Sequence, residues 1–249
     1  MWDRPDLLNR AASLLQALAL LLIAAAALAG AGRLAVFALR EVNVEGDLDH
    51  VTREQVELIV KREVKGTLFS TDVEAVRRAF EKLPWVRSVE VRRQWPPGLR
   101  VRLEEHVPLA RWGGLGLVNT QGELFQAASD RRLPEFVGPP GTAPEIAGRY
   151  AAFSRLLEPL GQGLAQVTVS PRRAWQVRLE NGLTIALGRE QMESRLERFV
   201  AVHERSVGVL GRRVAYVDLR YPNGFAVRVG AAAPEGGRRK GVSGEKSKA

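Results

Sequence analysis

The longest apolar stretch of the chain lies close to its first residue. Residues 11–32 contain no charged side chain, and Ser13 and Gln16 are their only strongly polar side chains. A run of about 20 apolar residues is long enough to cross a hydrocarbon core of roughly 30 Å. The pattern therefore predicts a single transmembrane helix over residues 11–32, preceded by a short tail of residues 1–10.

A secretory signal peptide is the alternative interpretation of this stretch. Residues 27–29 have the small-x-small pattern of a cleavage site, and Arg4 and Arg10 resemble a basic leading segment. The apolar run is longer than that of a typical signal peptide, which favours a retained anchor. Arg33 and Arg40 follow the run, so charge on its own does not set the orientation. The short tail and the large following domain favour a domain outside the cytoplasm.

Beyond the span, the apolar pattern predicts the order strand, helix, helix, strand, strand. Residues 40–46 have the pattern of a strand that ends in a glycine turn. Thr52 and Gln55 form a capping box, and Gly66 is expected to end the helix that follows. Residues 71–74 form a second capping box. The apolar faces expected for the two helices are Val56, Ile59 and Val60 in the first, and Val73, Val76, Phe80 and Leu83 in the second.

A strand hairpin with a charged outer face completes this α+β unit. Pro84 stops the preceding helix, because proline has no N–H group to donate within a helix. Residues 85–91 are rich in β-branched and aromatic side chains, and residues 95–98 (Trp-Pro-Pro-Gly) form a turn. In the strand after the turn, one face carries Leu99, Val101 and Leu103, and the other carries Arg100, Arg102 and Glu104.

The second half of the chain is predicted to contain two helices among several strands. Apolar spacing predicts helices over residues 145–160 and about 190–210. A hairpin is predicted over residues 117–125, and further strands over residues 167–170, 175–179, 183–187, 214–220 and 225–229. Asn181-Gly182 is a dipeptide favoured in tight hairpin turns. Residues 231–249 lose all apolar periodicity and are predicted to be a disordered basic tail.

Composition and motifs exclude several kinds of site. The chain has 249 residues, a net charge of +9 and 45% hydrophobic residues, enough for two modest domains. It has no cysteine, which rules out disulfides and thiolate sites and suits an oxidising compartment. Its three histidines are far apart, and it has no Gly-x-Ser-x-Gly elbow and no phosphate-binding glycine loop.

The residues closest to an acid–base cluster are 104–106 (Glu-Glu-His). Glu105 would face away from Glu104 and His106 in a strand, so a solvated strand end is favoured. The sequence therefore predicts no catalytic, cofactor-binding or metal-binding residue.

Arginine pairs recur along the chain, at residues 92–93, 131–132, 172–173 and 212–213. A basic surface could in principle bind nucleic acid. Stacking aromatic residues are sparse, however, and a domain beyond a membrane span rarely meets nucleic acid. Solvated strand faces with salt bridges are the favoured interpretation for most of these pairs.

The final strand has two interpretations that the residues alone leave even. At a sheet edge, the free N–H and C=O groups of residues 225–229 would pair with an incoming strand, with Tyr221 as an aromatic anchor. As an ordinary closing strand, it would bury Phe225 in the core and place Tyr221 at a corner.

Seven short motifs follow one another along the chain. They are residues 82–86 (Lys-Leu-Pro-Trp-Val), 91–96 (Val-Arg-Arg-Gln-Trp-Pro), 104–112 (Glu-Glu-His-Val-Pro-Leu-Ala-Arg-Trp), 133–139 (Leu-Pro-Glu-Phe-Val-Gly-Pro), 174–177 (Ala-Trp-Gln-Val), 187–189 (Leu-Gly-Arg) and 217–221 (Val-Asp-Leu-Arg-Tyr). Each motif is weak by itself. Together and in this order, they resemble the FtsQ/DivIB family of bacterial division proteins, and the resemblance extends from the apolar span to about Gly230.

The resemblance implies an α+β architecture in three parts. A single transmembrane helix precedes a β-α-α-β-β POTRA domain over residues 39–108. A mixed α/β domain with an extended, mostly antiparallel sheet follows over residues 109–230. The implied location is the inner membrane at the division septum, with the first residues in the cytoplasm and both domains in the periplasm.

The resemblance also implies a non-enzymatic scaffold that binds the FtsB–FtsL coiled coil and so helps to control septal peptidoglycan synthesis. Family members bind FtsB through their last strand and adjoining helix. By position, this role falls to Tyr221, Asn223, Gly224 and Phe225, with Arg173 as a further contact. Pro222 departs from the family pattern at this turn. FtsW, FtsI, FtsK and FtsN are further expected partners.

Two functions of other classes compete with this interpretation. A POTRA-bearing receptor for protein export or outer-membrane insertion would have repeated POTRA units and a long alternating barrel region, and the sequence has neither. A cell-wall hydrolase would need a catalytic constellation that the sequence lacks.

Overall fold

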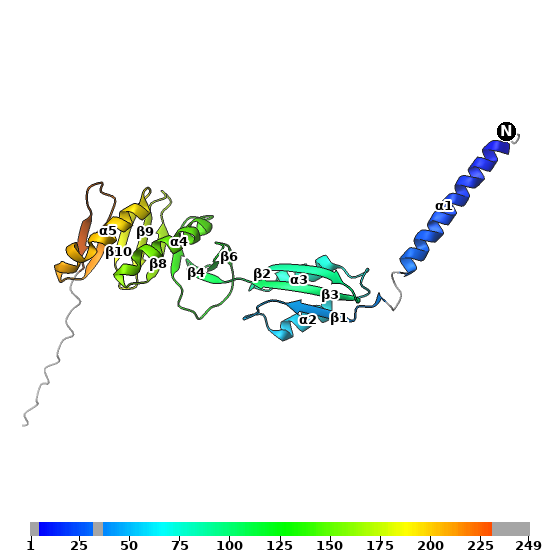
Figure 1. Cartoon of the computed structure of the whole chain (residues 1–249), viewed down its shortest axis with the longest axis horizontal. Coiled ribbons are helices and arrows are strands. Elements are labelled where there is room, and N and C mark those ends of the chain that lie inside the picture. The colour runs from blue at the N-terminus through cyan, green and yellow to red at the C-terminus, as the bar shows by residue number, and fades with distance from the viewer. Residues whose placement is uncertain (1–4, 32–36, 231–249) are drawn as a thin grey trace, which may run out of the picture. The chain divides into compact units, whose positions relative to one another are not determined.

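The computed structural model describes residues 5–31 and 37–230, without the side chains of residues 5–8, 11, 28–31 and 210. Helix α1 (Pro5–Ala31) is the first element (Figure 1). Among the described residues, no helix is both long and apolar enough to cross a membrane. The tail predicted over residues 231–249 lies outside the described residues, as do residues 1–4 and the last residue of the predicted span.

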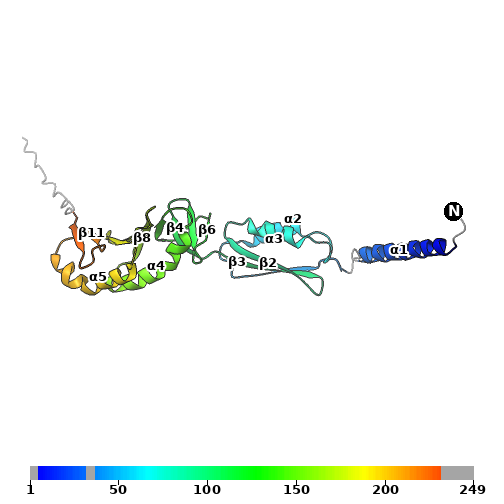
Figure 2. The same ribbon diagram turned by 90° about the horizontal axis from the view of Figure 1, so that it is seen from above.

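The chain divides into two compact units, Met1–His106 and Val107–Ala249. In the first unit, strands β1 (Glu41–Glu45), β2 (Val86–Gln94) and β3 (Gly98–Glu105) form a sheet in the order β1-β3-β2. Strand β3 pairs in parallel with β1 and antiparallel with β2. Helices α2 (Arg53–Glu63) and α3 (Val73–Glu81) lie together on one side of this sheet (Figure 2).

The predicted hairpin and helix faces of the first unit are confirmed in most details. Leu99, Val101 and Leu103 are buried on one face of β3, while Arg100, Arg102 and Glu104 are exposed on the other. Val76 and Phe80 of α3 are fully buried in a cluster with residues of all three strands. The α2 residues Val56, Ile59 and Val60 contact this cluster but are only partly buried.

Two details of the helix ends differ from the predictions. Thr52 and Gln55 form the predicted capping box, but α2 ends at Glu63, before Gly66. The N-cap of α3 is Asp72, whose side chain accepts hydrogen bonds from two backbone N–H groups of the first turn. Thr71 is instead buried, and its hydroxyl donates to backbone carbonyls of the preceding loop. The second capping box was therefore placed one residue too early.

The second unit is built on a nine-stranded sheet in the order β12-β11-β10-β9-β8-β7-β4-β5-β6. The strands are β4 (Pro108–Trp112), β5 (Gly116–Asn119), β6 (Leu124–Phe125), β7 (Glu135–Val137), β8 (Leu164–Val169), β9 (Trp175–Leu179), β10 (Thr184–Gly188), β11 (Val214–Asp218) and β12 (Ala226–Val229). The pairs β4–β7, β7–β8 and β10–β11 are parallel, and the other pairs are antiparallel. The expectation of a mixed, mostly antiparallel sheet is therefore confirmed.

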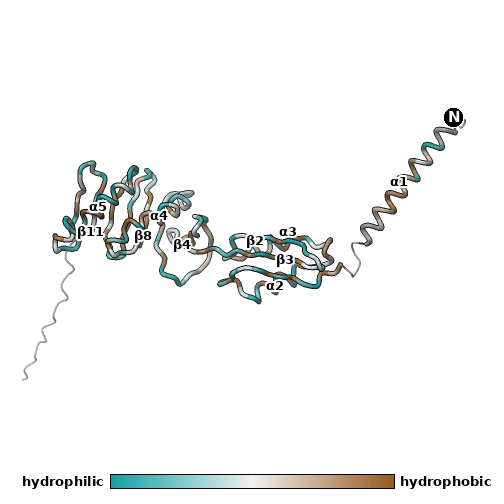
Figure 3. Tube along the Cα trace, viewed as in Figure 1, coloured by the Kyte–Doolittle hydropathy of each residue, from teal (hydrophilic) through white to brown (hydrophobic). Residues whose placement is uncertain are grey.

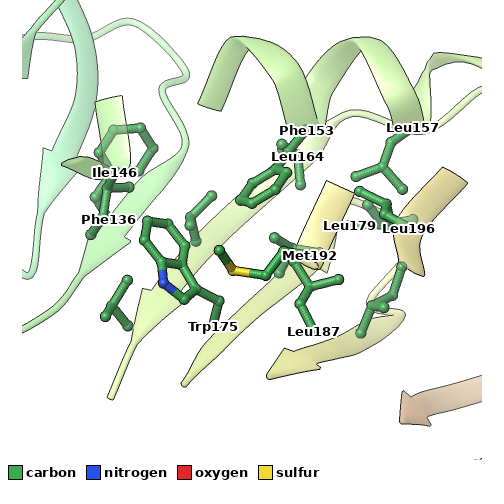
Figure 4. Close-up of a cluster of buried hydrophobic side chains, with 14 of the residues drawn as sticks. Phe136, Ile146, Phe153, Leu157, Leu164, Trp175, Leu179, Leu187, Met192 and Leu196 are labelled. Atoms are coloured by element: carbon green, nitrogen blue, oxygen red, sulfur yellow. The ribbon is translucent and has the colours of Figure 1, made fainter. Parts of the chain in front are cut away.

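Helices α4 (Ala143–Leu157) and α5 (Met192–Ser206) cover the core of the second unit, and short 3₁₀ helices follow them at Glu158–Leu160 and Gly208–Leu210. Large side chains from both helices meet those of the strands, as Figure 4 shows for Phe153, Trp175 and Met192. Hydrophobic and hydrophilic residues alternate along much of the second unit's sheet, whereas the middle of α1 is hydrophobic (Figure 3). The sequence pattern did not predict β4 or β7, which join the two halves of the sheet.

Candidate functional site

Strand β12 lies at the edge of the nine-stranded sheet. It pairs antiparallel with β11, and it is the last strand in the sheet order. The register sets Asp218 opposite Ala226 and Val217 opposite Val227, with a bulge in β11 before Val214 pairs with Val229. The predicted edge position of the final strand is confirmed, and so is the packing of Phe225 against the core, which belonged to the alternative interpretation.

The direction of one hydrogen bond shows which backbone groups of β12 point outward. The Gly230 N–H donates to the carbonyl of Arg213, at 2.9 Å, and so points toward the neighbouring strand. Backbone groups alternate in direction along a strand. The N–H and C=O groups of Val227 and Val229 therefore point away from β11, toward the open edge.

The side chains of β12 and the residue before it fix the strand against the core. The rings of Phe225 and Phe199 are edge-to-face, with centroids 5.3 Å apart, so Phe225 ties the strand to α5. Val227 contacts the same core. On the other face, the guanidinium of Arg228 lies 5.2 Å from the centroid of the Tyr216 ring. Phe225 and Val227 therefore pack on the core side of the strand, and Arg228 lies on the other face.

A groove of about 260 Å³ lies beside this edge, between α5 and the turn that leads into β12. Tyr221, on the turn, is 55% exposed, and Val202, on α5, is 40% exposed. Both expose apolar surface at the groove. The residues that line the groove are Arg195, Arg198, Phe199, Val202, Leu219, Tyr221, Pro222, Asn223, Gly224 and Phe225.

An ion pair holds the end of β11 just before the groove turn. Arg220 donates to both carboxylate oxygens of Asp218, with the shortest contact at 2.6 Å, and its backbone N–H donates to the same carboxylate. The guanidinium lowers the pKa of Asp218, against a smaller opposing effect of burial. The carboxylate in turn raises the pKa of Arg220. Asp218 is buried and remains ionised at neutral pH, so it fixes the direction in which the chain leaves the sheet.

Four of the five predicted site residues come together at this groove. Tyr221, Asn223, Gly224 and Phe225 all line it. Sequence reasoning did not identify Arg195, Arg198 and Val202 of α5, which form the opposite wall. Their spacing of three and four residues puts them on one helix face, and the two arginines beside Val202 are the only signal that this face is not simply part of the core.

The structure does not bring Arg173 to the groove. This residue lies in the turn between β8 and β9, at φ 62°, and its guanidinium pairs with the Glu145 carboxylate at 2.6 Å. The β8–β9 turn lies at the same end of the sheet as the groove, but β10 and β11 separate β9 from β12. Three strand spacings correspond to roughly 15 Å. Arg173 and the groove would contact one partner only if that partner extended along the sheet end.

Of residues 104–106 (Glu-Glu-His), Glu105 stabilises the fold of the first unit. The Glu105 carboxylate accepts hydrogen bonds from the backbone N–H groups of Val51, His50 and Asp49, at 2.8, 3.0 and 3.3 Å, and lies 2.9 Å from the His50 ring. Burial by itself raises the pKa of Glu105, but these hydrogen bonds outweigh it and leave the pKa below its ordinary value. Among the described residues, no group of three acidic or histidine side chains could hold a metal ion.

Comparisons with known proteins match both units of the chain. The model of the C-terminal region of the cell division proteins FtsQ and DivIB matches residues 110–220, and the model of the FtsQ-type POTRA domain matches residues 37–106. The first match ends before the groove turn and β12.

Several relatives named cell division protein FtsQ match over nearly their whole length. The one from Nitrosospira multiformis is 49% identical over 233 residues, which cover 92% of this chain and 99% of the relative. The one from Burkholderia pseudomallei is 43% identical over 235 residues, which cover 92% and 94%. The one from Neisseria gonorrhoeae is 35% identical over 237 residues, which cover 95% and 97%.

Proposed function

Because this chain belongs to the FtsQ/DivIB family of cell division proteins, we propose that it is a non-enzymatic, membrane-attached scaffold of the division machinery. In this proposal, strand β12 captures the C-terminal region of FtsB and so links the chain to the FtsB–FtsL coiled coil. The observation that carries the proposal is an open strand edge beside a groove lined by exposed apolar and basic side chains.

The incoming segment would add a strand to the sheet next to β12. Val227 and Val229 point their N–H and C=O groups toward the open edge, and a strand that pairs with them satisfies these groups without moving β11. Main-chain hydrogen bonds of this kind give affinity with little sequence preference. Selectivity must then come from side chains beside the strand.

The groove next to β12 would supply that selectivity. Tyr221 and Val202, which are both exposed, offer apolar contact area to an aromatic or aliphatic side chain of the partner. Arg195 and Arg198 on the opposite wall favour an acidic residue at its rim. Large side chains that fill a pocket at the centre of an interface usually carry most of its binding energy. Tyr221 is the expected anchor on this side of the interface.

Helix α1 would attach the scaffold to the inner membrane, with the first residues in the cytoplasm and both units in the periplasm. Its described middle exposes a run of large apolar side chains: Leu14, Leu15, Leu18, Leu20, Leu21, Leu22 and Ile23. The uncharged run of residues 11–32 matches the roughly 20 residues that cross a bilayer. In this arrangement the POTRA unit would contact other division proteins, such as FtsW, FtsI, FtsK or FtsN, at the septum.

Substitution of Val229 by proline tests whether strand addition depends on the outward backbone N–H group of β12. Proline removes the outward N–H group, while the inward hydrogen bonds of the neighbouring residues to β11 remain, and proline is tolerated at such edge positions. We expect Val229→Pro to weaken binding of the full chain to a labelled peptide from the C-terminal end of FtsB by about tenfold or more. Fluorescence anisotropy measures this change.

Val229→Ala is the matched control, because it shortens the side chain but keeps the N–H group. It should bind within about threefold of the unmodified chain, and circular dichroism should show both variants folded. Equal affinities of the proline and alanine variants would contradict strand addition. Absence of binding by the folded, unmodified chain would overturn the assignment of FtsB as the partner.

A further inference from the structure

Two large aromatic side chains of the first unit are exposed to solvent. Trp95, in the turn between β2 and β3, is 70% exposed, and Phe69, in the loop between α2 and α3, is 60% exposed. Phe69 makes an edge-to-face contact with Phe37, with ring centroids 5.1 Å apart. Single exposed apolar side chains are common on proteins, whereas aromatic residues gathered in one patch mark a place where a protein meets a partner or a membrane.

Hydrogen bonds bring the two aromatic residues to the same end of the unit. The guanidinium of Arg93, at the end of β2, donates to the carbonyls of Leu68 and Thr71, at 2.6 and 2.9 Å. The loop that carries Phe69 is therefore fastened to the strand that leads directly into the Trp95 turn.

This end of the unit is also the end at which the chain enters it. The Arg40 N–H donates to the Pro97 carbonyl at 3.0 Å, and the register sets Glu41 opposite Gly98. Strands β1 and β3 are parallel, so both run from this end toward the other. The chain leaves the unit after β3, at the end opposite Trp95.

The chain length between α1 and this end is short. Helix α1 ends at Ala31, and the described part of the chain resumes at Phe37, which contacts Phe69. Six residue steps span at most roughly 20 Å even when fully extended. If α1 lies in a membrane, the end of the unit that carries Trp95 and Phe69 stays close to the membrane surface.

The charged groups at this end favour an anionic surface. Arg40, Lys65 and Arg93 are exposed there. Two acidic residues lie near them: Glu41 follows Arg40 in the chain, and Asp72, next to Thr71, is paired with Arg78 at 3.9 Å. Tryptophan next to basic residues is the composition typical of protein segments at the boundary between lipid headgroups and acyl chains.

We propose that this end of the POTRA unit binds the membrane interface, with Trp95 and Phe69 inserted among the headgroups and Arg40 and Lys65 facing anionic lipid. The contact rests on the proposed attachment of α1 to the membrane. The unit would then be attached to the membrane twice, through α1 and through this end. Two attachments restrict its movement and hold it at a defined height above the bilayer.

Quenching of tryptophan fluorescence by brominated acyl chains tests the contact. The full chain is reconstituted in vesicles of phosphatidylcholine, alone or with about a third phosphatidylglycerol, and flotation of the vesicles first establishes that the chain is attached. The quenched part of the fluorescence should fall in Trp95→Phe. It should not fall in Trp85→Phe, the matched control, because Trp85 stacks on His50 at the opposite end of the same sheet.

The lipid dependence tests the role of the basic residues. Quenching of Trp95 should increase with phosphatidylglycerol, and the double variant Arg40→Gln, Lys65→Gln should lose this increase. Equal quenching in both kinds of vesicle would overturn the assignment of anionic lipid. If the chain floats with the vesicles but Trp95 is not quenched, the contact is wrong, and this end would instead be available to a protein. A chain that does not float would overturn both the attachment of α1 and this inference.

Discussion

At the scale of single residues, Asp218 and Arg220 decide how the chain leaves β11 for the groove turn. Asp218 is buried, whereas the Arg220 side chain is 59% exposed, so solvent screens much of their attraction. A hydrogen-bonded charge pair in this setting contributes about 1 kcal/mol to the free energy of unfolding. Asp218→Asn should therefore destabilise the second unit by about this amount at neutral pH.

The pH dependence of this effect follows from the direction of the pKa shift. The pKa of Asp218 is lower in the folded chain, so its contribution is complete above the ordinary pKa of about 4 and disappears as the pH falls through the lower folded value. Urea unfolding at pH 7 and at about pH 3 should show the difference between Asp218→Asn and the unmodified chain shrinking in acid. A difference that stays constant would show that the carboxylate charge is not what stabilises this corner.

Single residues also show how far sequence patterns reach. The turn motif from Tyr221 to Phe225 identified one wall of the groove, because its residues are adjacent in the chain. The α5 wall, with Arg195 and Val202, escaped notice because a helix face that lines a groove has the same spacing as one that faces a core. Arg173 was assigned by resemblance alone. Its pairing with Glu145, on a separate helix, is a contact that spacing cannot predict.

At the scale of elements, the N-cap of α3 gives a clear test of which residue starts this helix. The Asp72 carboxylate accepts hydrogen bonds from the N–H groups of Glu74 and Ala75, both at 3.0 Å. Asp72→Ala should therefore cost about 1 kcal/mol of stability, measured by urea unfolding of the full chain. Thr52→Ala, at the capping box of α2, is the matched control and should cost a similar amount. Asp72→Asn should retain most of the stability, since asparagine caps equally well. A neutral Asp72→Ala would show that this cap does not stabilise the helix.

The elements that sequence patterns missed share a physical cause. Strand β7 has only three residues and pairs in parallel with β4 and β8, so residues far apart in the chain stabilise it. Strand β4 is longer, but its pairing with β7 is also with a distant part of the chain. Local propensity carries little information about such strands. The position of β12 at the edge is a property of the same kind. Helix α5 connects β10 to β11, which lies next to β10 and parallel to it. Strand β12 then pairs with the outer side of β11 and has no second neighbour in the sheet.

At the scale of the whole molecule, the two units have separate cores. Phe80 is fully buried in a cluster made only of first-unit residues, and Phe153 is fully buried in a cluster made only of second-unit residues. Truncation of a buried phenylalanine to alanine typically costs about 3–5 kcal/mol, because it removes apolar contacts and leaves a cavity. Each substitution should therefore destabilise its own unit and leave the other nearly unchanged.

Hydrogen exchange of the full chain, combined with binding of the FtsB peptide, separates these effects. Phe80→Ala should lose amide protection in α3, β2 and β3 while the peptide still binds with unchanged affinity, since β12 and its groove belong to the other unit. Phe153→Ala should retain protection in the first unit but weaken peptide binding, because the sheet behind the groove loses its support. Loss of peptide binding in Phe80→Ala would mean that the second unit depends on the first to fold. Peptide binding at the β12 edge would then require a folded first unit. Disturbance of the POTRA unit would in that case release the partner from the scaffold.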